Sequence, residues 1–189
     1  MRKTGFRKSL ILLVISAALV LAVAGCGNNL SSGTELTTID PMSFTAIDNR
    51  IRDYNFGINE YMREHSAEAT QKVTSGATPG GVPAECTYTI SPDGKYESLQ
   101  MQKALDNAVQ IDEYFNLGDA VFFARTTVYN DGSFDPVEKY YIIDGTLYKI
   151  DGSAESVMKV VDLSDASAET AKANLDMYFS FDEIRELYA

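Results

Sequence analysis

The sequence predicts an α+β fold: a long N-terminal helix packed on an antiparallel meander sheet of six to seven strands, with short helices at the C-terminal end. Three observations predict it. Apolar residues recur at helical spacing over residues 44–65, alternating apolar runs separated by glycine turns fill residues 86–150, and a helix-capping pattern begins at Ser180.

The long helix is predicted to start at Asp40 as N-cap, with Pro41 in the first helical position and Ile39 packed against Phe44. From Phe44 to His65, apolar residues follow alternating spacings of three and four, and polar residues fill the other faces. We therefore expect one helix of seven or eight turns that packs across the sheet of its own domain. A short coiled-coil dimer is the alternative.

Three successive hairpins are predicted for residues 86–150, with turn glycines at Gly94, Gly118 and Gly145. The last hairpin is the clearest, because an Asp-Gly pair supplies the positive φ angles of a two-residue turn. Residues 75–84 contain three glycines and two prolines and are interpreted as a connection. Residues 157–163 are the candidate seventh strand.

Two short helices are expected after the sheet. Residues 167–179 favour a helix by their alanine content, and Ser180 with Glu183 forms a capping box for a last helix. Aromatic residues mark both faces of the sheet, since Phe122 and Phe123 point to opposite sides of one strand. With the long helix on one face, the other is covered either by the C-terminal helices or by a ligand or partner.

The N-terminus has the layout of a secretory signal peptide. Four basic residues lie in the first eight, and residues 10–24 are apolar except for one serine. This stretch is shorter than the roughly 20 residues that cross a bilayer, so a retained transmembrane helix is the weaker interpretation. An ordinary signal peptide is a further alternative.

The apolar run ends in Val23, Ala24, Gly25 and Cys26, which resembles the lipobox of bacterial lipoproteins with valine in place of the usual leucine. The resemblance implies cleavage after Gly25 and acylation of Cys26 by lipid chains such as diacylglycerol and palmitate. Three segments follow: residues 1–25 as lipoprotein signal peptide, 26–38 as flexible tether, and 39–189 as a single α+β domain. The expected location is the cell membrane, lipid-anchored on its extracytoplasmic side.

Charge limits the partners. The full chain has a net charge of −11, and removal of residues 1–25 deletes four basic and no acidic side chains, which lowers it to −15. This argues against nucleic acid and against electrostatic adhesion to anionic lipid. If Cys26 is lipidated, Cys86 has no cysteine partner, so we expect it to be buried in a strand, the alternative being a reactive or intermolecular thiol.

No motif predicts catalysis, a cofactor or a metal. The single histidine, His65, is interpreted as a packed or capping residue. Ser156-x-x-Lys159 matches a nucleophile motif, but its flanks look like a strand. Residues 130–135 alternate oxygen ligands without the rest of a calcium loop and are interpreted as a turn. Asp112 and Glu113 are adjacent in a predicted strand and therefore point to opposite faces.

The hairpin pattern is similar to that of small, uncharacterised lipoproteins of the bacterial envelope and, distantly, to half-barrel lipid carriers, without a diagnostic residue for either. We expect a membrane-anchored, non-enzymatic module that binds a protein or small ligand. The alternative is a half-barrel carrier of a lipid or other apolar molecule, and a third class is a hydrolase with an unrecognised serine or aspartate.

Overall fold

The computed structural model describes residues 40, 42–65 and 70–188. The chain divides into two units, Met1–Thr38 and Ile39–Ala189, and every described residue belongs to the second. The predicted signal peptide, the predicted tether with Cys26, and Pro41 lie outside the described residues. No helix within the described ranges has the length and apolar character needed to span a bilayer.

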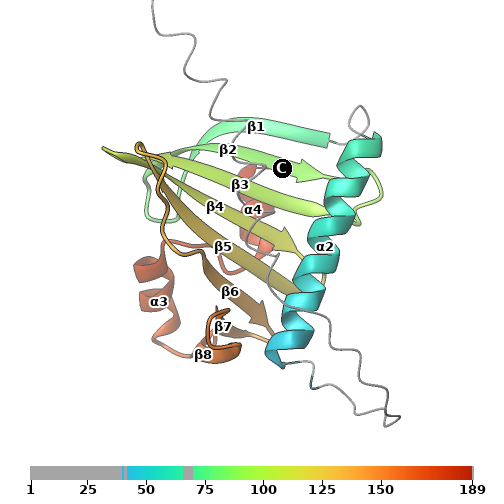
Figure 1. The fold of residues 1–189 in the computed structure, drawn as a ribbon, viewed down its shortest axis with the longest axis vertical. Helices are drawn as coiled ribbons and strands as arrows, with labels where there is room; N and C mark the ends of the chain where they lie inside the picture. Colours follow the sequence, from blue (N-terminus) through green and yellow to red (C-terminus); the bar gives the residue numbers. More distant parts are fainter. Residues whose placement is uncertain (1–39, 41, 66–69, 189) are drawn as a thin grey trace, which may run out of the picture. The chain divides into compact units, whose positions relative to one another are not determined.

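The second unit is an α+β fold built on one eight-stranded antiparallel sheet whose strands lie side by side in chain order (Figure 1). Helix α2 (Phe44–His65) precedes the sheet, and helices α3 (Ala168–Leu175) and α4 (Phe181–Tyr188) follow it. The predicted class, a helix followed by a meander and two short helices, is confirmed. The strands are β1 (Thr70–Ala77), β2 (Pro83–Ile90), β3 (Glu97–Ala104), β4 (Ala108–Asn116), β5 (Ala120–Tyr129), β6 (Glu138–Ile143), β7 (Thr146–Asp151) and β8 (Ser156–Asp162).

The strand count corrects the prediction of six to seven. The candidate seventh strand is present as β8, and the eighth is β1, part of which the sequence assigned to a connection. β1 pairs with β2 over its whole length, from Thr70 opposite Ile90 to Ala77 opposite Pro83. β1 is an edge strand that is held by its backbone hydrogen bonds to β2. These bonds do not depend on the side chains, so the strand forms here without the apolar alternation that marks the inner strands.

The start of α2 also differs from the prediction. The helix begins at Phe44, after Ser43, whose hydroxyl accepts a hydrogen bond from the Ala46 N–H at 3.3 Å. Ser43 is therefore the capping residue, whereas Asp40 makes a turn by accepting the Met42 N–H at 2.9 Å. At 22 residues the helix has about six turns rather than seven or eight.

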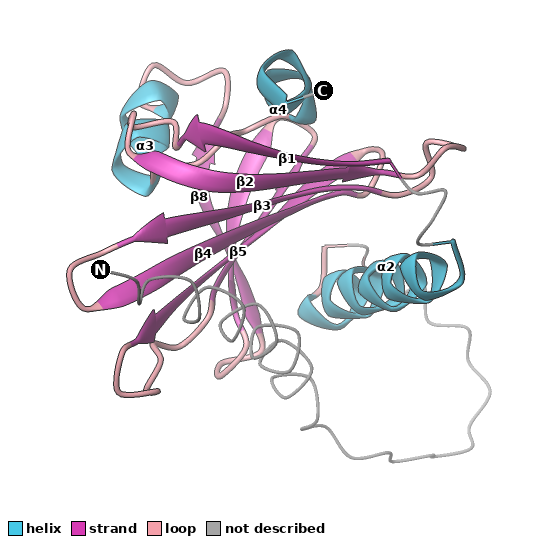
Figure 2. Ribbon diagram, turned by 90° about the horizontal axis from the view of Figure 1, so that it is seen from above, coloured by secondary structure: helices cyan, strands magenta, loops and turns pink. Residues whose placement is uncertain are grey.

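The helices cover opposite faces of the sheet (Figure 2). α2 packs on one, which we call the α2 face, where Ile47 lies in a cluster with Phe115, Phe122 and Tyr141. α3 and α4 pack on the other, which we call the C-terminal face. The long helix therefore packs on its own sheet, and the C-terminal helices, not a vacant surface, cover the second face.

Two buried carboxylates fasten the C-terminal helices to the sheet. The side chain of Glu97, 3% exposed on β3, accepts hydrogen bonds from Arg185 of α4 at 2.7 and 2.5 Å. Asp112 of β4 pairs with Arg125 of β5 at 2.7 and 2.6 Å, and that guanidinium also donates to the carbonyls of Leu175 and Asp176 at the end of α3. These bonds fix where α3 and α4 lie relative to the edge strand β1.

Candidate functional site

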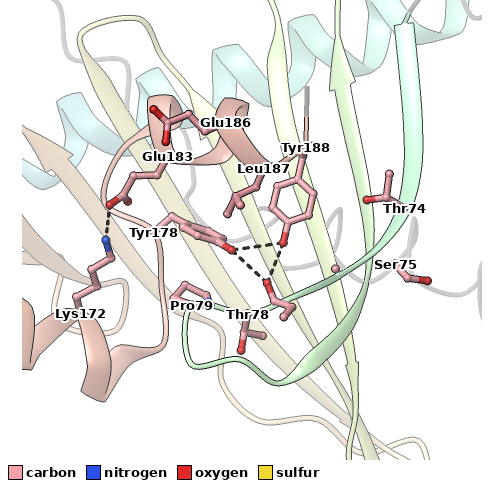
Figure 3. Close-up of a pocket in the computed structure, with 12 residues that line it drawn as sticks. Thr74, Ser75, Thr78, Pro79, Lys172, Tyr178, Glu183, Glu186, Leu187 and Tyr188 are labelled. Atoms are coloured by element: carbon pink, nitrogen blue, oxygen red, sulfur yellow. Dashed lines mark hydrogen bonds and ion pairs between the residues drawn. The ribbon is translucent and has the colours of Figure 1, made fainter.

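A groove of about 520 Å³ lies where the edge strand β1 meets α4 (Figure 3). We call it the edge groove. One wall is formed by residues 74–79, which are the end of β1 and the start of the loop after it. The other wall comes from α3, α4 and the segment between them. The residues of that second wall are Lys172, Tyr178, Glu183, Glu186, Leu187 and Tyr188.

Two tyrosine hydroxyls fasten this second wall to the strand. Tyr178 and Tyr188 both donate to the Ala77 carbonyl, at 3.1 and 2.8 Å, and their oxygens lie 3.4 Å apart (Figure 3). Burial raises the pKa of both hydroxyls. Each hydroxyl therefore keeps its single proton at neutral pH and uses it for the same carbonyl. The tyrosines act here as hydrogen-bond donors, not as titrating groups.

Gly76 allows Tyr188 to lie against the strand. A Cβ added at Gly76 would meet Cε1 of Tyr188 at 2.7 Å and the Cys86 sulfur at 3.2 Å. Cys86 itself is fully buried in β2, as the sequence predicts, and burial raises the pKa of its thiol. The thiol therefore packs beneath the groove as a small apolar group.

The loop beyond β1 is held by the end of α3. Asp176, the left-handed C-terminal residue of α3, accepts the Gly80 N–H at 2.5 Å and forms an ion pair with Lys103 at 3.1 Å. Burial alone would raise the pKa of Asp176, but these two partners hold it below its ordinary value. The loop is thereby tied across to α3, which fixes the wall that Thr78 and Pro79 form.

The outer rim of the groove is amphipathic and acidic. Lys172 forms an ion pair with Glu183, so their charges offset each other. Glu186 is exposed and forms no hydrogen bond or ion pair with another described residue, and Leu187 beside it is 63% exposed. The groove therefore offers one unneutralised carboxylate and apolar surface to whatever occupies it.

A second, smaller hollow of about 180 Å³ lies on the α2 face. Its side chains are mainly polar and come from four neighbouring strands. Glu113 accepts a hydrogen bond from Gln100 at 3.0 Å through Oε1, while its solvent-shielded Oε2 has no partner among the described residues. Burial raises the pKa of Glu113. The lining residues are Gln71, Thr87, Thr89, Ser98, Leu99, Gln100, Glu113 and Phe115.

Within its described residues, the structure places the candidate reactive residues His65 and Cys86 apart from one another. Cys26 lies outside the described residues. His65 stacks on Tyr61 at the end of α2, with 4.7 Å between ring centroids, whereas Cys86 lies in the core of the C-terminal face. The two are on opposite sides of the sheet, so the structure does not pair them.

The remaining motifs lie in a strand, in a turn and on opposite faces of the sheet. Ser156 and Lys159 lie in β8, as their flanks indicated, and Lys159 pairs with Asp162. Residues 130–135 form a turn in which Asp131 accepts hydrogen bonds from Ser133. Asp112 and Glu113 do point to opposite faces, and across the described ranges no three histidine, cysteine, aspartate or glutamate residues gather as a metal site requires.

The chain matches no protein-family model, no curated protein and no solved structure at significant similarity. The candidate site therefore rests on geometry alone. The sequence predicts the last helix, which carries Tyr188, but it does not indicate the groove, because the first wall of the groove belongs to the unpredicted strand β1. The only residue whose type hinted at the groove was Gly76, because a glycine within a strand can mark a close approach of another group. From the sequence alone it is interpreted as part of a loop, since the strand around it is not predicted.

Proposed function

We propose that the chain is a membrane-anchored, extracytoplasmic lipoprotein whose folded domain is a non-enzymatic binding module, with the edge groove as its binding site. The groove carries the proposal, because its volume lies within the range of ligand sites and its walls are fixed in place before any ligand arrives. The lipobox-like residues 23–26 support the anchor.

The chemistry of the lining suits binding better than catalysis. The tyrosine hydroxyls are committed to the Ala77 carbonyl, Lys172 is committed to Glu183, and the groove lining contains no histidine or cysteine. What the rim leaves available is a carboxylate, an exposed leucine and strand backbone. These groups recognise shape and charge, and none is positioned to activate a nucleophile.

A carrier of lipid or other apolar molecules is the alternative from the sequence. Such cargo requires a cavity lined mainly by apolar side chains. The hollow on the α2 face is instead lined mainly by threonine, serine, glutamine and glutamate, with Leu99 and Phe115 as its only apolar lining residues, so this hollow does not support the carrier. Mass spectrometry of organic extracts from the purified domain tests it, and a copurified lipid would favour the carrier over the module.

The anchor is tested with the full chain expressed in a bacterium. We expect the protein in the membrane fraction, with an N-terminal peptide beginning at Cys26 and heavier by its acyl chains. Cys26→Ala should abolish the added acyl mass. The variant should then either be cleaved by another route and leave the membrane, or keep its uncleaved signal peptide. An unmodified thiol at Cys26 in the native cell would contradict the proposal.

The binding site is tested by a photoreactive amino acid at Leu187, with Phe134 as the matched control. Both side chains are large, apolar and exposed, at 63% and 68%, but Phe134 lies in the loop between β5 and β6, away from the groove. In the native cell we expect a discrete adduct from position 187 and none from position 134. No adduct at 187, or equal adducts at both positions, would contradict the groove as the binding site.

A further inference from the structure

We infer that the edge groove binds an extended, basic polypeptide segment of a partner protein, which adds to the sheet as a ninth strand beside β1. This inference rests on the proposed function of the groove and names the class of its ligand. Three features carry it: the unpaired backbone of β1, the regularity of that edge, and the acidic side pocket next to it.

The hydrogen-bond pattern of β1 shows which backbone groups are available. The Thr78 N–H donates to the Val82 carbonyl at 2.8 Å, so in this register every second residue before it directs its backbone toward β2. The backbone groups of Val73, Ser75 and Ala77 therefore point outward. The position of the Ala77 carbonyl, which receives both tyrosine hydroxyls, agrees with this pattern.

Val73 and Ser75 together offer two donors and two acceptors to a new strand. β1 is the last strand of the sheet on this side, and no described residue pairs with its outer edge. Strand addition uses main-chain hydrogen bonds for affinity and pockets under alternate side chains for specificity. The edge groove supplies such a pocket, because its lining begins at Thr74 and Ser75.

The two edges of the sheet differ in how they resist a new strand. Where β8 pairs with β7, Leu147 lies opposite Val161 and Tyr148 opposite Lys159, so Val160 forms a bulge on β8, and Lys159 beside it is exposed. Bulges and lysines are devices that block edge-to-edge pairing. β1 also carries one lysine, Lys72, which lies outside the groove lining, but it has no register shift over its eight residues, so the bulge is what distinguishes the two edges. The open edge is thus β1.

Charge defines the occupant. The groove presents the unneutralised Glu186, and the full chain carries a net charge of −11. A lysine or arginine of the added strand would lay its apolar stem along Leu187 and Tyr188 and bring its cationic end to Glu186. A second copy of this acidic chain would bring like charges together, so the edge suits a foreign basic segment rather than a homodimer.

The test uses the folded protein and three blocked ten-residue peptides. The first alternates lysine with threonine and valine, the second replaces each lysine with glutamate, and the third repeats the first with N-methyl groups on alternate amides. We expect the first peptide to slow hydrogen exchange at the amides of Val73 and Ser75 at least tenfold at low salt. The acidic and N-methylated peptides should leave both amides unprotected.

Two variants of Ser75 separate backbone pairing from side-chain contact. Ser75→Pro removes an N–H that the sheet does not use, which edge strands tolerate, and should weaken binding of the basic peptide at least tenfold. Ser75→Ala keeps the N–H and should bind as the native protein does. Glu186→Gln should weaken binding several-fold and reduce its salt dependence. If Ser75→Pro fails to fold, the N-methylated peptide makes the same distinction.

The possible results distinguish failure of the strand-addition inference from failure of the proposed function. Equal binding of the basic and N-methylated peptides, no protection at Val73 and Ser75, or a concentration-dependent dimer formed through β1 would each overturn the strand-addition inference. If position 187 still crosslinks a ligand in the native cell and Ser75→Pro does not alter that adduct, the groove remains a binding site and only this inference falls. Absence of any adduct at position 187 removes the proposed function itself.

Discussion

The hydroxyl of Tyr54 on α2 bridges both backbone groups of Glu97 at the start of β3: it accepts the N–H at 2.7 Å and donates to the carbonyl at 3.0 Å. The carboxylate of the same Glu97 points to the opposite face, where Arg185 of α4 binds it. One residue of the sheet is therefore held by helices on both sides. This arrangement couples the placement of α2 to that of α4, which forms one wall of the edge groove.

Replacing Tyr54 with Phe should lower the free energy of unfolding by about 1–3 kcal/mol, because two partly buried backbone groups lose their partner. Urea titration of the purified domain measures the change. Tyr148→Phe is the matched control, since no hydrogen bond of the Tyr148 hydroxyl joins it to another described residue, and it should change stability little. A Tyr54→Phe variant as stable as the native protein would show that the bridge contributes nothing.

Acid should weaken the attachment of α4 through Glu97. Burial alone would raise the pKa of Glu97, but hydrogen bonds from Arg185, Tyr88 and Asn116 hold it below its ordinary value of 4.5. The folded state therefore binds this proton less readily than the unfolded chain does. The stability that the carboxylate contributes is complete above about pH 4.5 and is lost as the pH falls through the lower folded-state value.

Comparison of the native protein with Glu97→Gln isolates this carboxylate. We expect the variant to be less stable at pH 7, and the difference in unfolding free energy to shrink as the pH is lowered from 5 to 3. Glu138→Gln, which removes an exposed partner of Lys149, should show a small difference at every pH. A Glu97→Gln difference that stays constant with pH would argue against the ionised carboxylate as its source.

Glu113 should show the opposite sign. Burial raises its pKa, and Oε2 has no partner among the described residues, so the ionised form destabilises the fold. Glu113→Gln should therefore raise the free energy of unfolding at pH 7 by about 1 kcal/mol, at the low end of the cost of an unsatisfied buried polar group. The gain should disappear as the pH falls below the ordinary glutamate pKa, where the native side chain is also neutral.

The measurement is again chemical denaturation at a series of pH values. Glu85→Gln on β2 is the control, because Glu85 is exposed and its replacement should leave stability unchanged at all pH values. Loss of stability in Glu113→Gln at pH 7 would mean that the carboxylate has a favourable partner in the folded protein.

The inner hairpins could be predicted because their turns depend on a local property of glycine. Gly94, Gly118 and Gly145 all adopt positive φ angles, of 70°, 91° and 66°, which other residues adopt at a cost. Ser180 and Glu183 likewise interact within four residues, since the Glu183 N–H donates to the Ser180 hydroxyl at 3.3 Å. Interactions between residues this close in the chain can be recognised from the sequence without any knowledge of the tertiary structure.

The edge groove could not be predicted, because it depends on contacts between distant parts of the chain. β1 carries polar residues on an edge and lacks apolar alternation, and the hydroxyls of Tyr178 and Tyr188 reach a backbone carbonyl about 100 residues earlier in sequence. A backbone carbonyl leaves no mark in the amino-acid sequence. The predicted start of α2 was wrong for a related reason. Both Asp40 and Ser43 are good capping residues, and their sequence alone does not decide which of them begins the helix.

Gly76→Ala should disrupt the groove from within the strand. The added methyl group would lie 2.7 Å from Cε1 and 2.9 Å from the hydroxyl of Tyr188, so the ring must leave its place against β1 and lose its bond to Ala77. Overpacking of this kind costs about 1–3 kcal/mol. We expect a lower midpoint of thermal unfolding, together with increased exposure of tyrosine in the near-ultraviolet spectrum.

Gly152→Ala is the matched control for this substitution. Gly152 lies in the turn between β7 and β8, where an added Cβ meets nothing within 4 Å. Its stability should equal that of the native protein or exceed it slightly, because alanine restricts the unfolded chain. If Gly76→Ala were as stable as Gly152→Ala and kept the native tyrosine spectrum, the close packing of Tyr188 on β1 would not be what shapes the groove.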